Sequence, residues 1–453
     1  MEFSGKNVLV FGTGISGISA AKLLLDKGAD VVLFDGNEEL DRTRILENFD
    51  DTDRVRLYLG DLAKEAAAVL DLVILSPGIP LDLPFVIEFR EAGIPVWGEV
   101  ELAWQCGKGD VLAITGTNGK TTTTALLGEI MEHSFPHVKV VGNIGIPYTG
   151  AVEDSTEDTV TVAEISSFQL ETIREFHPAI SAVLNITPDH LNRHHTMENY
   201  TAAKLAIAKN QTEEDVCVLN YEDEIIREHA DQIRAKAVYF SSLHRLDEGI
   251  YLNGNKIIYA DGTSETEVVS TDELNILGRH NYENAMAASA MALSYGVPLE
   301  KIRETLKSFQ AVEHRIEYVT EKRGVRFYND SKGTNPDAAI KGIQAMDRPT
   351  CLIGGGYDKD SSYTEWIRAF DGKVKVLVLI GQTREKIAEE AKACGFTEFV
   401  FADSLQEAVD ICYKRAENGD AVLLSPACAS WGMFPNYEVR GKMFKEMVNA
   451  LEE

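Results

Sequence analysis

Residues 111–124, with the sequence VLAITGTNGKTTTT, restrict the possible folds more than any other part of the chain. A short apolar run leads into a glycine turn, and a helical pattern begins at Lys120. Such a strand–turn–helix unit points backbone N–H groups at the N-terminal end of the helix, where a polyphosphate binds. Lys120 would then contact the terminal phosphates, and the Thr121 hydroxyl would ligate Mg²⁺. The spacing G-x-x-G-K-T is two residues shorter than the standard motif, so a plain glycine turn capped by threonines is the alternative.

Length and composition predict a protein of two or three domains in the cytoplasm. A chain of 453 residues exceeds what one hydrophobic core usually serves. Residues 1–7 lack the features of a signal peptide, and no apolar run approaches the ~18 residues of a membrane-spanning helix. The six cysteines form no C-x-x-C pair, which favours reduced thiols over a disulfide framework or a zinc site. A net charge of -28 argues against a nucleic-acid partner but allows a small anionic ligand in a local basic pocket.

The first segment carries a dinucleotide-binding pattern. A buried-strand pattern at 6–12 is followed by Gly12, Gly14 and Gly17 and then by a helical run. A second strand at 31–34 ends on Asp35, about 20 residues after the first glycine, where an acid can bind a ribose. Taken alone, this pattern predicts NAD in a small doubly wound domain whose ligand lies at the carboxyl ends of the strands.

Two further strands, in a second segment that begins near Glu99, end in polar residues. The strand predicted at 159–165 delivers Glu164, and the strand at 180–186 leads to His190. Because the carboxyl ends of parallel strands share one edge of a sheet, both side chains could hold a metal beside the phosphates. The alternative is that Glu164 caps a helix and His190 is an ordinary loop residue.

Two helices in this segment carry polar side chains on one face. A helix predicted at 197–210 places Tyr200 and Lys204 one turn apart, although spacing alone favours a solvated surface lysine. Asn281 and Asn284, at the start of an alanine-rich helix, share a face and can present their amides together, or one of them can be an N-cap. Between the helices, residues 249–262 predict a hairpin that turns on Asn253-Gly254.

A third segment, from about Val312, predicts another α/β sheet. Strand patterns at 325–329, 350–353, 374–380 and 421–424 alternate with helical runs. The loops after these strands concentrate polar residues, in the sequences DSKGTNP (330–336), GGGYDK (354–359) and SPACASW (425–431).

A set of motifs in fixed order resembles the Mur ligases, ATP-dependent amide-forming enzymes of peptidoglycan synthesis. The motifs are GTNGKTT (116–122), GNIG (142–145), EISSFQLE (164–171), NITPDHL (185–191), GRHN (278–281), EHRIE (313–317), DSK (330–332) and SPACAS (425–430). The resemblance covers essentially the whole chain. Within the family it favours the members that add D-glutamate to UDP-N-acetylmuramoyl-L-alanine. Three features favour them: the early glycine fingerprint, the acceptor motif DSKGTN in place of the DNP pattern of the diamino-acid-adding ligase, and the SPACAS sequence.

The resemblance implies an α/β fold with three domains and a monomer in the cytoplasm that neither binds nucleic acid nor inserts into a membrane. Residues 1–98 would be a Rossmann-like domain that binds the UDP of the substrate rather than NAD. Residues 99–311 would form a central P-loop ATPase-like domain with a mostly parallel sheet. Residues 312–453 would form a Rossmann-like α/β domain that binds the amino acid.

The resemblance also implies the chemistry and the site residues. ATP would phosphorylate the alanine carboxylate to an acyl phosphate, which the amine of D-glutamate would attack. Two Mg²⁺ are expected, one held by Thr121 and Glu164, the other by His190 and a carbamylated Lys204; Lys120 completes the catalytic set. The implied ATP contacts are Gly116, Thr117, Asn118, Gly119, Lys120, Thr121, Thr122, Asn281, Asn284, Arg315 and Asp330. The implied UDP-substrate contacts are Gly14, Ile15, Ser16, Asp35, Gly36, Ser76, Pro77, Gly78 and Asn143. The implied D-glutamate contacts are Lys332, Thr334, Lys359, Ser430 and Tyr437.

The sequence departs from the family pattern at a few positions. Asn192 stands where aspartate is common, Gly333 replaces a usual alanine, and the loop after Ser430 differs at Gly432 and Pro435. Gly333, Gly432 and Pro435 concern the geometry of the acceptor pocket. Three other functions remain as alternatives: a related ligase with another amino-acid or polyglutamate acceptor, an NAD-dependent dehydrogenase, and a non-enzymatic nucleotide-binding regulator.

Overall fold

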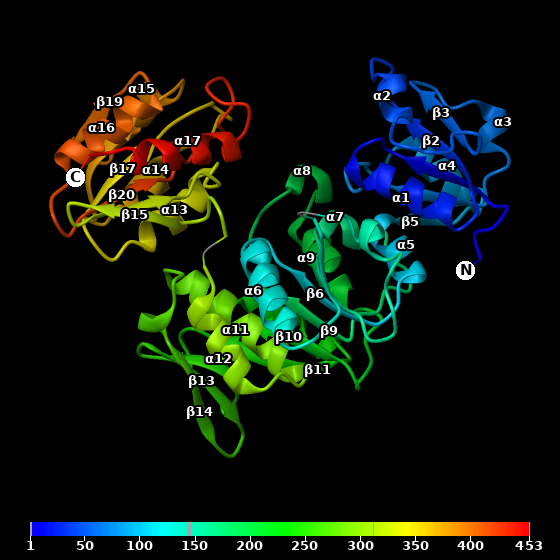
Figure 1. Ribbon diagram of the computed structural model, residues 1–453, viewed down its shortest axis with the longest axis horizontal. Coiled ribbons are helices and arrows are strands. Elements are labelled where there is room, and N and C mark those ends of the chain that lie inside the picture. The colour runs from blue at the N-terminus through cyan, green and yellow to red at the C-terminus, as the bar shows by residue number, and fades with distance from the viewer. Residues whose placement is uncertain (1, 144–145, 311, 453) are drawn as a thin grey trace. The chain divides into compact units, whose positions relative to one another are not determined.

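The computed structural model describes residues 2–143, 146–310 and 312–452 of the chain, which forms two compact units. One unit comprises Met1–Ser270 and Glu283–Leu306, and the other comprises Thr271–Tyr282 and Lys307–Glu453. Each unit is built of sheets covered by helices (Figure 1). The first unit holds two sheets and the second unit holds one.

The first sheet has five parallel strands in the order β3-β2-β1-β4-β5. Its strands and helices are β1 (Asn7–Phe11), α1 (Ile15–Asp26), β2 (Asp30–Asp35), α2 (Arg42–Leu46), β3 (Val55–Leu59), α3 (Lys64–Ala67), β4 (Leu72–Leu75), α4 (Pro84–Glu91) and β5 (Val96–Gly98). β4 is apolar along its whole length, and β1 is apolar after Asn7, because helices cover both faces of a parallel sheet. Strand order reverses between β1 and β4, which is where open α/β sheets bind ligands.

The second sheet has nine strands in the order β14-β13-β12-β11-β10-β9-β6-β8-β7. Its strands are β6 (Asp110–Thr115), β7 (Val138–Gly142), β8 (Val160–Glu164), β9 (Ile180–Val183), β10 (Val216–Asn220), β11 (Lys236–Ser241), β12 (Glu248–Asn253), β13 (Lys256–Asp261) and β14 (Glu265–Ser270). The strands from β7 to β12 in this order run parallel, and only β13 and β14 are antiparallel to their neighbours. The predicted mostly parallel sheet is therefore confirmed.

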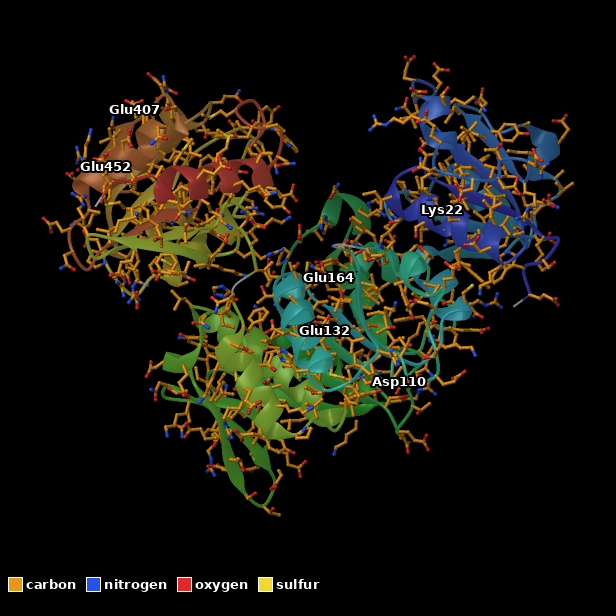
Figure 2. All side chains as sticks on the ribbon, in the orientation of Figure 1. Lys22, Asp110, Glu132, Glu164, Glu407 and Glu452 are labelled. Atoms are coloured by element: carbon orange, nitrogen blue, oxygen red, sulfur yellow. The ribbon has the colours of Figure 1, made fainter. Side chains whose placement is uncertain are left out.

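The helices that belong to this part of the chain are α5 (Glu99–Cys106), α6 (Lys120–Glu132), α7 (Ser167–Leu170), α8 (Leu191–His194), α9 (Met197–Leu205), α10 (Glu224–His229), α11 (Arg279–Ser294) and α12 (Leu299–Ser308). Short 3₁₀ helices are η1 (Tyr148–Ala151), η2 (Ala206–Ala208), η3 (Ala230–Gln232) and η4 (Thr271–Glu273). Figure 2 shows Glu164 and Glu132 at opposite ends of α6, so the carboxyl end of β8 lies beside the N-terminal end of that helix.

The third sheet has six strands in the order β15-β16-β20-β17-β18-β19, of which only β15 is antiparallel to its neighbour. Its strands and helices are β15 (Glu317–Lys322), β16 (Val325–Asn329), α13 (Pro336–Gln344), β17 (Thr350–Gly354), α14 (Thr364–Arg368), β18 (Val374–Leu379), α15 (Arg384–Ala393), β19 (Phe399–Phe401), α16 (Leu405–Arg415), β20 (Ala421–Leu424) and α17 (Tyr437–Asn449). The predicted α/β class is confirmed by all three sheets.

Two sequence-based details differ from the structure. The expected helix at 197–210 is divided into α9 and the 3₁₀ turn η2, which ends at Ala208. In the hairpin of β12 and β13, Asn253 pairs with Lys256, so the turn residues are Gly254 and Asn255 rather than Asn253 and Gly254.

Three further findings concern the chain as a whole. The predicted domain bounds stay a prediction, and Ala311, at one of them, is outside the described residues. All six cysteines are free thiols. No helix among the described residues combines the length and the apolar character needed to cross a bilayer.

Candidate active site

The phosphate loop of the sequence prediction connects β6 to α6, and its glycines are packed tightly. Gly119 has a φ of +87°, a left-handed conformation that favours glycine. A Cβ on Gly119 would lie 2.3 Å from Oδ1 of Asn284, and one on Gly116 would lie 2.9 Å from Cβ of Leu184. The hydroxyl of Thr123, in the first turns of α6, donates to the same Asn284 oxygen at 3.3 Å. Asn284 therefore contacts both the loop and the helix that would hold a phosphate.

Asn185, which follows β9, fixes the conformation of the loop. Its side-chain oxygen accepts from the backbone N–H of Asn118 at 2.8 Å, and its amide donates to the carbonyl of Asn118 at 3.1 Å. The backbone N–H of Thr117 donates to the carbonyl of Asn185 at 2.9 Å. The loop is thus preorganised by the neighbouring strand, which reduces the entropy lost when a ligand binds.

Two lysines converge on the carbonyl oxygen of Gly116. Nζ of Lys120 donates to it at 2.8 Å, and Nζ of Lys204 donates to it at 2.8 Å. Lys204 is 2% exposed, so the interpretation of this residue as a solvated surface lysine is wrong. Its helix, α9, packs its polar face against the loop rather than against water, which spacing along the helix does not show.

The surroundings of Lys204 favour its neutral form. Burial lowers the pKa of its ammonium well below the ordinary value, the charge of Lys120 lowers it further, and Asp189 raises it. Its Nζ lies 4.7 Å from the ring centroid of the buried Tyr200, whose hydroxyl is 3.1 Å from Oγ1 of Thr117. A neutral amine is nucleophilic and an ammonium is not, so the protonation state of Lys204 bears on its predicted carbamylation, which stays a prediction.

Glu164 ends β8 at the edge of the sheet that bears the loop. Its backbone is level with Ile114 of β6, two residues before Gly116, and its side chain is buried. Oε1 accepts from Nδ2 of Asn143 at 3.1 Å. Asn143 was predicted as a UDP-substrate contact; of the motif around it, Ile144 and Gly145 lie outside the described residues.

His190 is at the same edge, after β9, but its side chain is half exposed. Its backbone has a φ of +52°, and its ring packs edge-on against Phe168 at 4.8 Å between centroids. Nε2 lies 3.5 Å from the carboxylate of Asp189. The loop follows β6, Glu164 ends β8 and His190 lies in the segment after β9, and these three strands are neighbours in the sheet. Their role as metal ligands stays a prediction.

The glycine loop of the first sheet lies at the crevice between β1 and β4. A Cβ on Gly12 would lie 2.5 Å from Oγ of Ser76, and one on Gly17 would lie 1.9 Å from the carbonyl of Gly12, so both positions require glycine. Ser76 Oγ is buried without a hydrogen-bond partner among the described residues. A buried polar atom of this kind beside a glycine loop is suited to a ligand oxygen or nitrogen.

Asp35, the acid that ends β2, holds the glycine loop itself. Its Oδ2 accepts from the N–H of Thr13 at 3.0 Å and from the Thr13 hydroxyl at 2.8 Å. Its role toward a ribose stays a prediction. Ile15, at the mouth of the loop, is 78% exposed, which leaves an apolar side chain at the surface where a ligand is expected.

In the second unit, the loops predicted to bind D-glutamate follow three neighbouring strands. Asp330, Lys332 and Thr334 follow β16, Lys359 follows β17, and Ser430 follows β20. The strand order β16-β20-β17 therefore brings these loops to one sheet edge. Nζ of Lys332 lies 3.8 Å from the ring centroid of Tyr437, the first residue of α17.

Asp330 is buried with an unusual environment for a carboxyl group. Burial raises the pKa of Asp330 to about 7, while a hydrogen bond from Ser425 and the charge of Arg315 oppose that rise. Oγ of Ser425 donates to Oδ2 at 2.6 Å. A Cβ at either Gly333 or Gly342 would lie within 3 Å of the same Oδ2, so two glycines leave room for this bond.

Arg440 ties the loops of this edge together. Its guanidinium is fully buried and donates to Oγ of Ser331 at 2.9 Å, to the carbonyl of Ser331 at 2.8 Å and to the carbonyl of Cys428 at 3.2 Å. It therefore joins the DSK loop to the SPACAS loop through α17.

Sequence reasoning missed Asn185, Ser425 and Arg440. Ser425 comes directly after the buried strand β20, and Asn185 comes two residues after the end of β9, a signal that could have found them. Arg440 gives no such signal, because the charge pattern of α17 does not distinguish it from the solvated charges around it. The ATP contacts predicted at Asn284 and around the loop belong to the first unit. Asn281, Arg315 and Asp330 belong to the second, and their approach to the loop stays a prediction.

A phosphate loop on a mostly parallel sheet, together with a glycine loop on a doubly wound sheet, defines an α/β nucleotide-binding protein. Three family models match the chain: a Mur ligase MurD-like N-terminal domain at residues 6–98, a Mur ligase middle domain at 114–292, and a Mur ligase glutamate ligase domain at 314–428. The chain belongs to the Mur ligase family, as the sequence motifs predicted.

Curated relatives match over the full length. The chain is 56% identical over 453 residues to the UDP-N-acetylmuramoylalanine--D-glutamate ligase of Lachnoclostridium phytofermentans, with 100% of both chains covered. It is 46% identical over 453 residues to the enzyme of the same name from Clostridioides difficile, again with 100% of both chains covered.

Solved structures of other Mur ligases share the fold. The UDP-N-acetylmuramate-alanine ligase of Thermotoga maritima matches with a TM-score of 0.61 at 21% identity, over 98% of this chain and 99% of that one. The MurF ligase of the same organism, solved in complex with ADP, matches with a TM-score of 0.60 at 15% identity, over 98% and 95%.

Proposed function

We propose that this chain is an ATP-dependent ligase that joins D-glutamate to UDP-N-acetylmuramoyl-L-alanine in the cytoplasmic stage of peptidoglycan synthesis. The observation that carries the proposal is the 56% identity, over the whole of both chains, to a ligase named for these two substrates. We further propose a monomer that acts on small-molecule substrates, with neither nucleic acid nor membrane as a partner.

The reaction consists of two transfers. A carboxylate oxygen of the alanine attacks the γ-phosphorus of ATP, and the bond from this phosphorus to the β-phosphate oxygen breaks. ADP departs, and the alanine carboxylate is now an acyl phosphate. The amine of D-glutamate then attacks the acyl carbon, the tetrahedral intermediate expels phosphate, and the amine loses a proton to give the amide. Catalysis of such transfers rests mostly on positioning and on charge neutralisation.

The residues of the phosphate loop perform the positioning. Backbone N–H groups of the loop and of the first turn of α6 bind the β- and γ-phosphates. Lys120, which in the free protein donates to the carbonyls of Gly116 and Thr117, turns to the phosphates and offsets the charge on the transferred group. The Asn185 hydrogen bonds keep the loop in place during the transfer.

The donor set is suited to Mg²⁺. We propose that Thr121 and Glu164 hold one ion beside the β- and γ-phosphates and that His190 and Lys204 hold a second. Bound Mg²⁺ would supply positive charge to the phosphate oxygens and to the reacting carboxylate. The buried carboxylate of Glu164, level with the loop on the neighbouring strand, is the observation that supports the first site.

Lys204 would serve as a Mg²⁺ ligand after a covalent change, because Mg²⁺ prefers oxygen ligands and neither an ammonium nor a neutral amine supplies one. We propose that its neutral amine attacks CO₂, forms an N–C bond and releases one proton, which leaves a carbamate with two hard oxygens. Burial of Nζ and its lowered pKa support the first step, since only the neutral amine reacts.

The two other substrates are assigned to the two remaining glycine-rich edges. We propose that the UDP-sugar binds at the glycine loop of the first sheet and also contacts Asn143, which follows β7 of the central sheet. The residues of the first sheet are Gly14, Ile15, Ser16, Asp35, Gly36, Ser76, Pro77 and Gly78. The unpartnered Ser76 hydroxyl supports this assignment. We propose that Lys332, Thr334, Lys359, Ser430 and Tyr437 bind D-glutamate, whose two carboxylates need cations and hydroxyl groups.

Phosphate release from Mg-ATP tests the function. The protein is incubated with UDP-N-acetylmuramoyl-L-alanine and, separately, with D-glutamate, L-glutamate or another amino acid. We expect release that requires both the UDP-substrate and D-glutamate. Release with a different amino acid would keep the ligase chemistry and overturn the acceptor. No release with any acceptor would favour a nucleotide-binding regulator, and a nicotinamide fluorescence titration would then test the dehydrogenase alternative.

A further inference from the structure

Two exposed aromatic side chains lie together beside the proposed acceptor loops. Trp431 is 53% exposed and Tyr357 is 41% exposed. Their ring centroids are 5.6 Å apart at an interplanar angle of 63°. An exposed pair of large aromatic rings is typical of a surface that contacts a ligand.

The backbone fixes the two loops that carry these rings. The N–H of Tyr357 donates to the carbonyl of Ala429 at 2.9 Å. A Cβ on Gly356 would lie 2.3 Å from that carbonyl, so the close approach of the loops requires glycine there. Ser430, between Ala429 and Trp431, is buried. The aromatic pair is therefore built on a rigid junction.

The same junction holds a lysine, Lys359, beside the ring of Trp431. Nζ of Lys359 lies 5.1 Å from the ring centroid of Trp431. The neighbouring carboxylate of Asp358 pairs instead with Lys386 at 3.0 Å. Across the described part of the chain, no carboxylate lies within ion-pair distance of Lys359. The indole thus lies beside an ammonium that has no carboxylate partner among the described residues.

We infer that Trp431 is a specificity-determining residue of the acceptor pocket. It holds the Lys359 ammonium toward the side-chain carboxylate of a dicarboxylic amino acid. The rings of Trp431 and Tyr357 cover the methylene groups between the two carboxylates of that amino acid. This inference rests on the proposed function. An ammonium above an indole keeps its charge while it loses rotamer freedom, so less entropy is lost when a carboxylate binds. The geometry therefore selects D-glutamate over acceptors with a neutral side chain.

Steady-state kinetics of three variants test this inference. Trp431→Ala should raise the KM for D-glutamate about tenfold, leave the KM for ATP within about twofold, and reduce the preference for D-glutamate over D-glutamine. Trp431→Phe, which keeps an aromatic face, should stay within about threefold of the wild type. Phe401→Ala is the matched control. Phe401 is also an exposed aromatic with a cation above it, Arg384 at 5.6 Å, but it lies on the edge strand β19.

A double-mutant cycle tests whether Trp431 acts through Lys359. If it does, Trp431→Ala should have little further effect on the KM for D-glutamate in a Lys359→Met background. Additive effects would overturn the inference, and so would an unchanged ratio of D-glutamate to D-glutamine. An equal loss in all kinetic parameters for Trp431→Ala but not for the Phe401→Ala control would mean that Trp431 has only a structural role.

Intrinsic fluorescence gives a readout independent of activity. Of the four tryptophans, Trp97 and Trp366 are buried and Trp104 is partly buried, so Trp431 reports most strongly on the solvent. D-glutamate added to the protein with a non-hydrolysable ATP analogue and UDP-N-acetylmuramoyl-L-alanine should change the emission of the wild type, but not of Trp431→Phe. An emission change without phosphate release would overturn the proposed function and keep the inference that Trp431 contacts the bound D-glutamate. Phosphate release with D-glutamate but no emission change would keep the proposed function and overturn the inference about Trp431.

Discussion

Lys204 illustrates how a single residue can be unstable in its ordinary form. An ammonium that is 2% exposed and has Lys120 as a neighbour carries a large desolvation cost, and its hydrogen bond to the Gly116 carbonyl offsets only part of it. Neutralisation, or conversion to a carbamate that binds a cation, removes the cost.

Replacement of Lys204 by alanine should abolish ligase activity while the protein still folds. We expect phosphate release to fall by at least about 100-fold, because the proposed second metal position loses its ligand. Lys22→Ala, at an exposed position of α1, is the control and should retain wild-type activity (Figure 2). Carbon-13 NMR of the wild type in labelled bicarbonate should give a carbamate signal that Lys204→Ala lacks. An active Lys204→Ala protein would refute the assignment.

Asp330 should make the second unit sensitive to pH. Its pKa rises from 3.8 to about 7 in the folded protein, mainly through burial, so between these values the folded state binds the proton more tightly than the unfolded state. The stabilising contribution of the protonated carboxyl is fully present below pH 3.8 and is lost as pH rises through about 7.

We therefore expect Asp330→Asn, which stays neutral, to gain thermal stability relative to the wild type as pH is raised from about 4 to 8. Melting temperatures across this range measure the effect, and Asp371→Asn, at an exposed turn, controls for the change in net charge. A difference between Asp330→Asn and the wild type that does not vary with pH would show that the carboxyl is ionised throughout.

These residues also mark what could be predicted from the sequence at this scale. Residue types at the ends of buried strands placed Glu164 and His190 at the correct edge. Lys204 was assigned to the site only through the family resemblance, since helical spacing describes which residues share a face and not what that face packs against. The Ser425–Asp330 hydrogen bond needs the space that Gly333 and Gly342 leave, and these two glycines come from different elements. A local sequence pattern does not show that residues from different elements meet at one carboxylate.

At the scale of elements, the carboxylate of Glu101 connects α5 to the segment before β9 of the central sheet. Glu101 is fully buried and accepts from three consecutive backbone N–H groups, those of Arg174, Glu175 and Phe176, at 2.7 to 3.1 Å. The three donors lie in the segment before β9, and α5 directly follows β5 of the first sheet. The carboxylate thus anchors the helix that links the two sheets of the first unit.

Removal of this anchor should destabilise the first unit. Glu101→Ala leaves the buried N–H of Phe176 and the part-buried N–H groups of Arg174 and Glu175 without their acceptor. We expect a loss of about 3 kcal/mol in unfolding free energy, seen as a fall of roughly 5 °C in melting temperature. Glu132→Ala, at an exposed position in the last turn of α6, should change stability by less than about 0.5 kcal/mol. Equal melting temperatures for Glu101→Ala and Glu132→Ala would contradict the anchoring role.

Elements were predicted well where hydrophobic runs are long and less well where they are short. The strands β1, β2, β6, β8 and β9 were all located, because a central parallel strand is apolar over its whole length. The hairpin was found but with its turn displaced by one residue, since Asn253-Gly254 and Gly254-Asn255 are both acceptable turn sequences. Helix α9 ends early because its last turn tightens to 3₁₀ geometry, a change that propensity does not encode.

For the whole molecule, the family motifs predicted three α/β sheets in the correct order along the chain, and the structure confirms this architecture. The NAD interpretation of the first glycine loop shows the limit of a local motif. The same backbone geometry serves any diphosphate, and only the full set of motifs separates a UDP ligand from NAD. The function was therefore predicted from the order of the motifs along the whole chain, not from any single site.

The division of the proposed ATP contacts between the two compact units predicts that ligands change the dimensions of the molecule. The phosphate loop and Asn284 belong to one unit, and Arg315 and Asp330 belong to the other. Both sets must contact one nucleotide for the acyl phosphate to be shielded from water, so ligand binding should bring the units into a closed state.

Small-angle X-ray scattering should show a smaller radius of gyration with a non-hydrolysable ATP analogue plus UDP-N-acetylmuramoyl-L-alanine than without ligands. Lys120→Ala, with its weakened phosphate binding, should show a reduced change under the same conditions. If the wild type binds both ligands with no change in dimensions, the residues of the second unit do not close over ATP, and their assignment as ATP contacts fails.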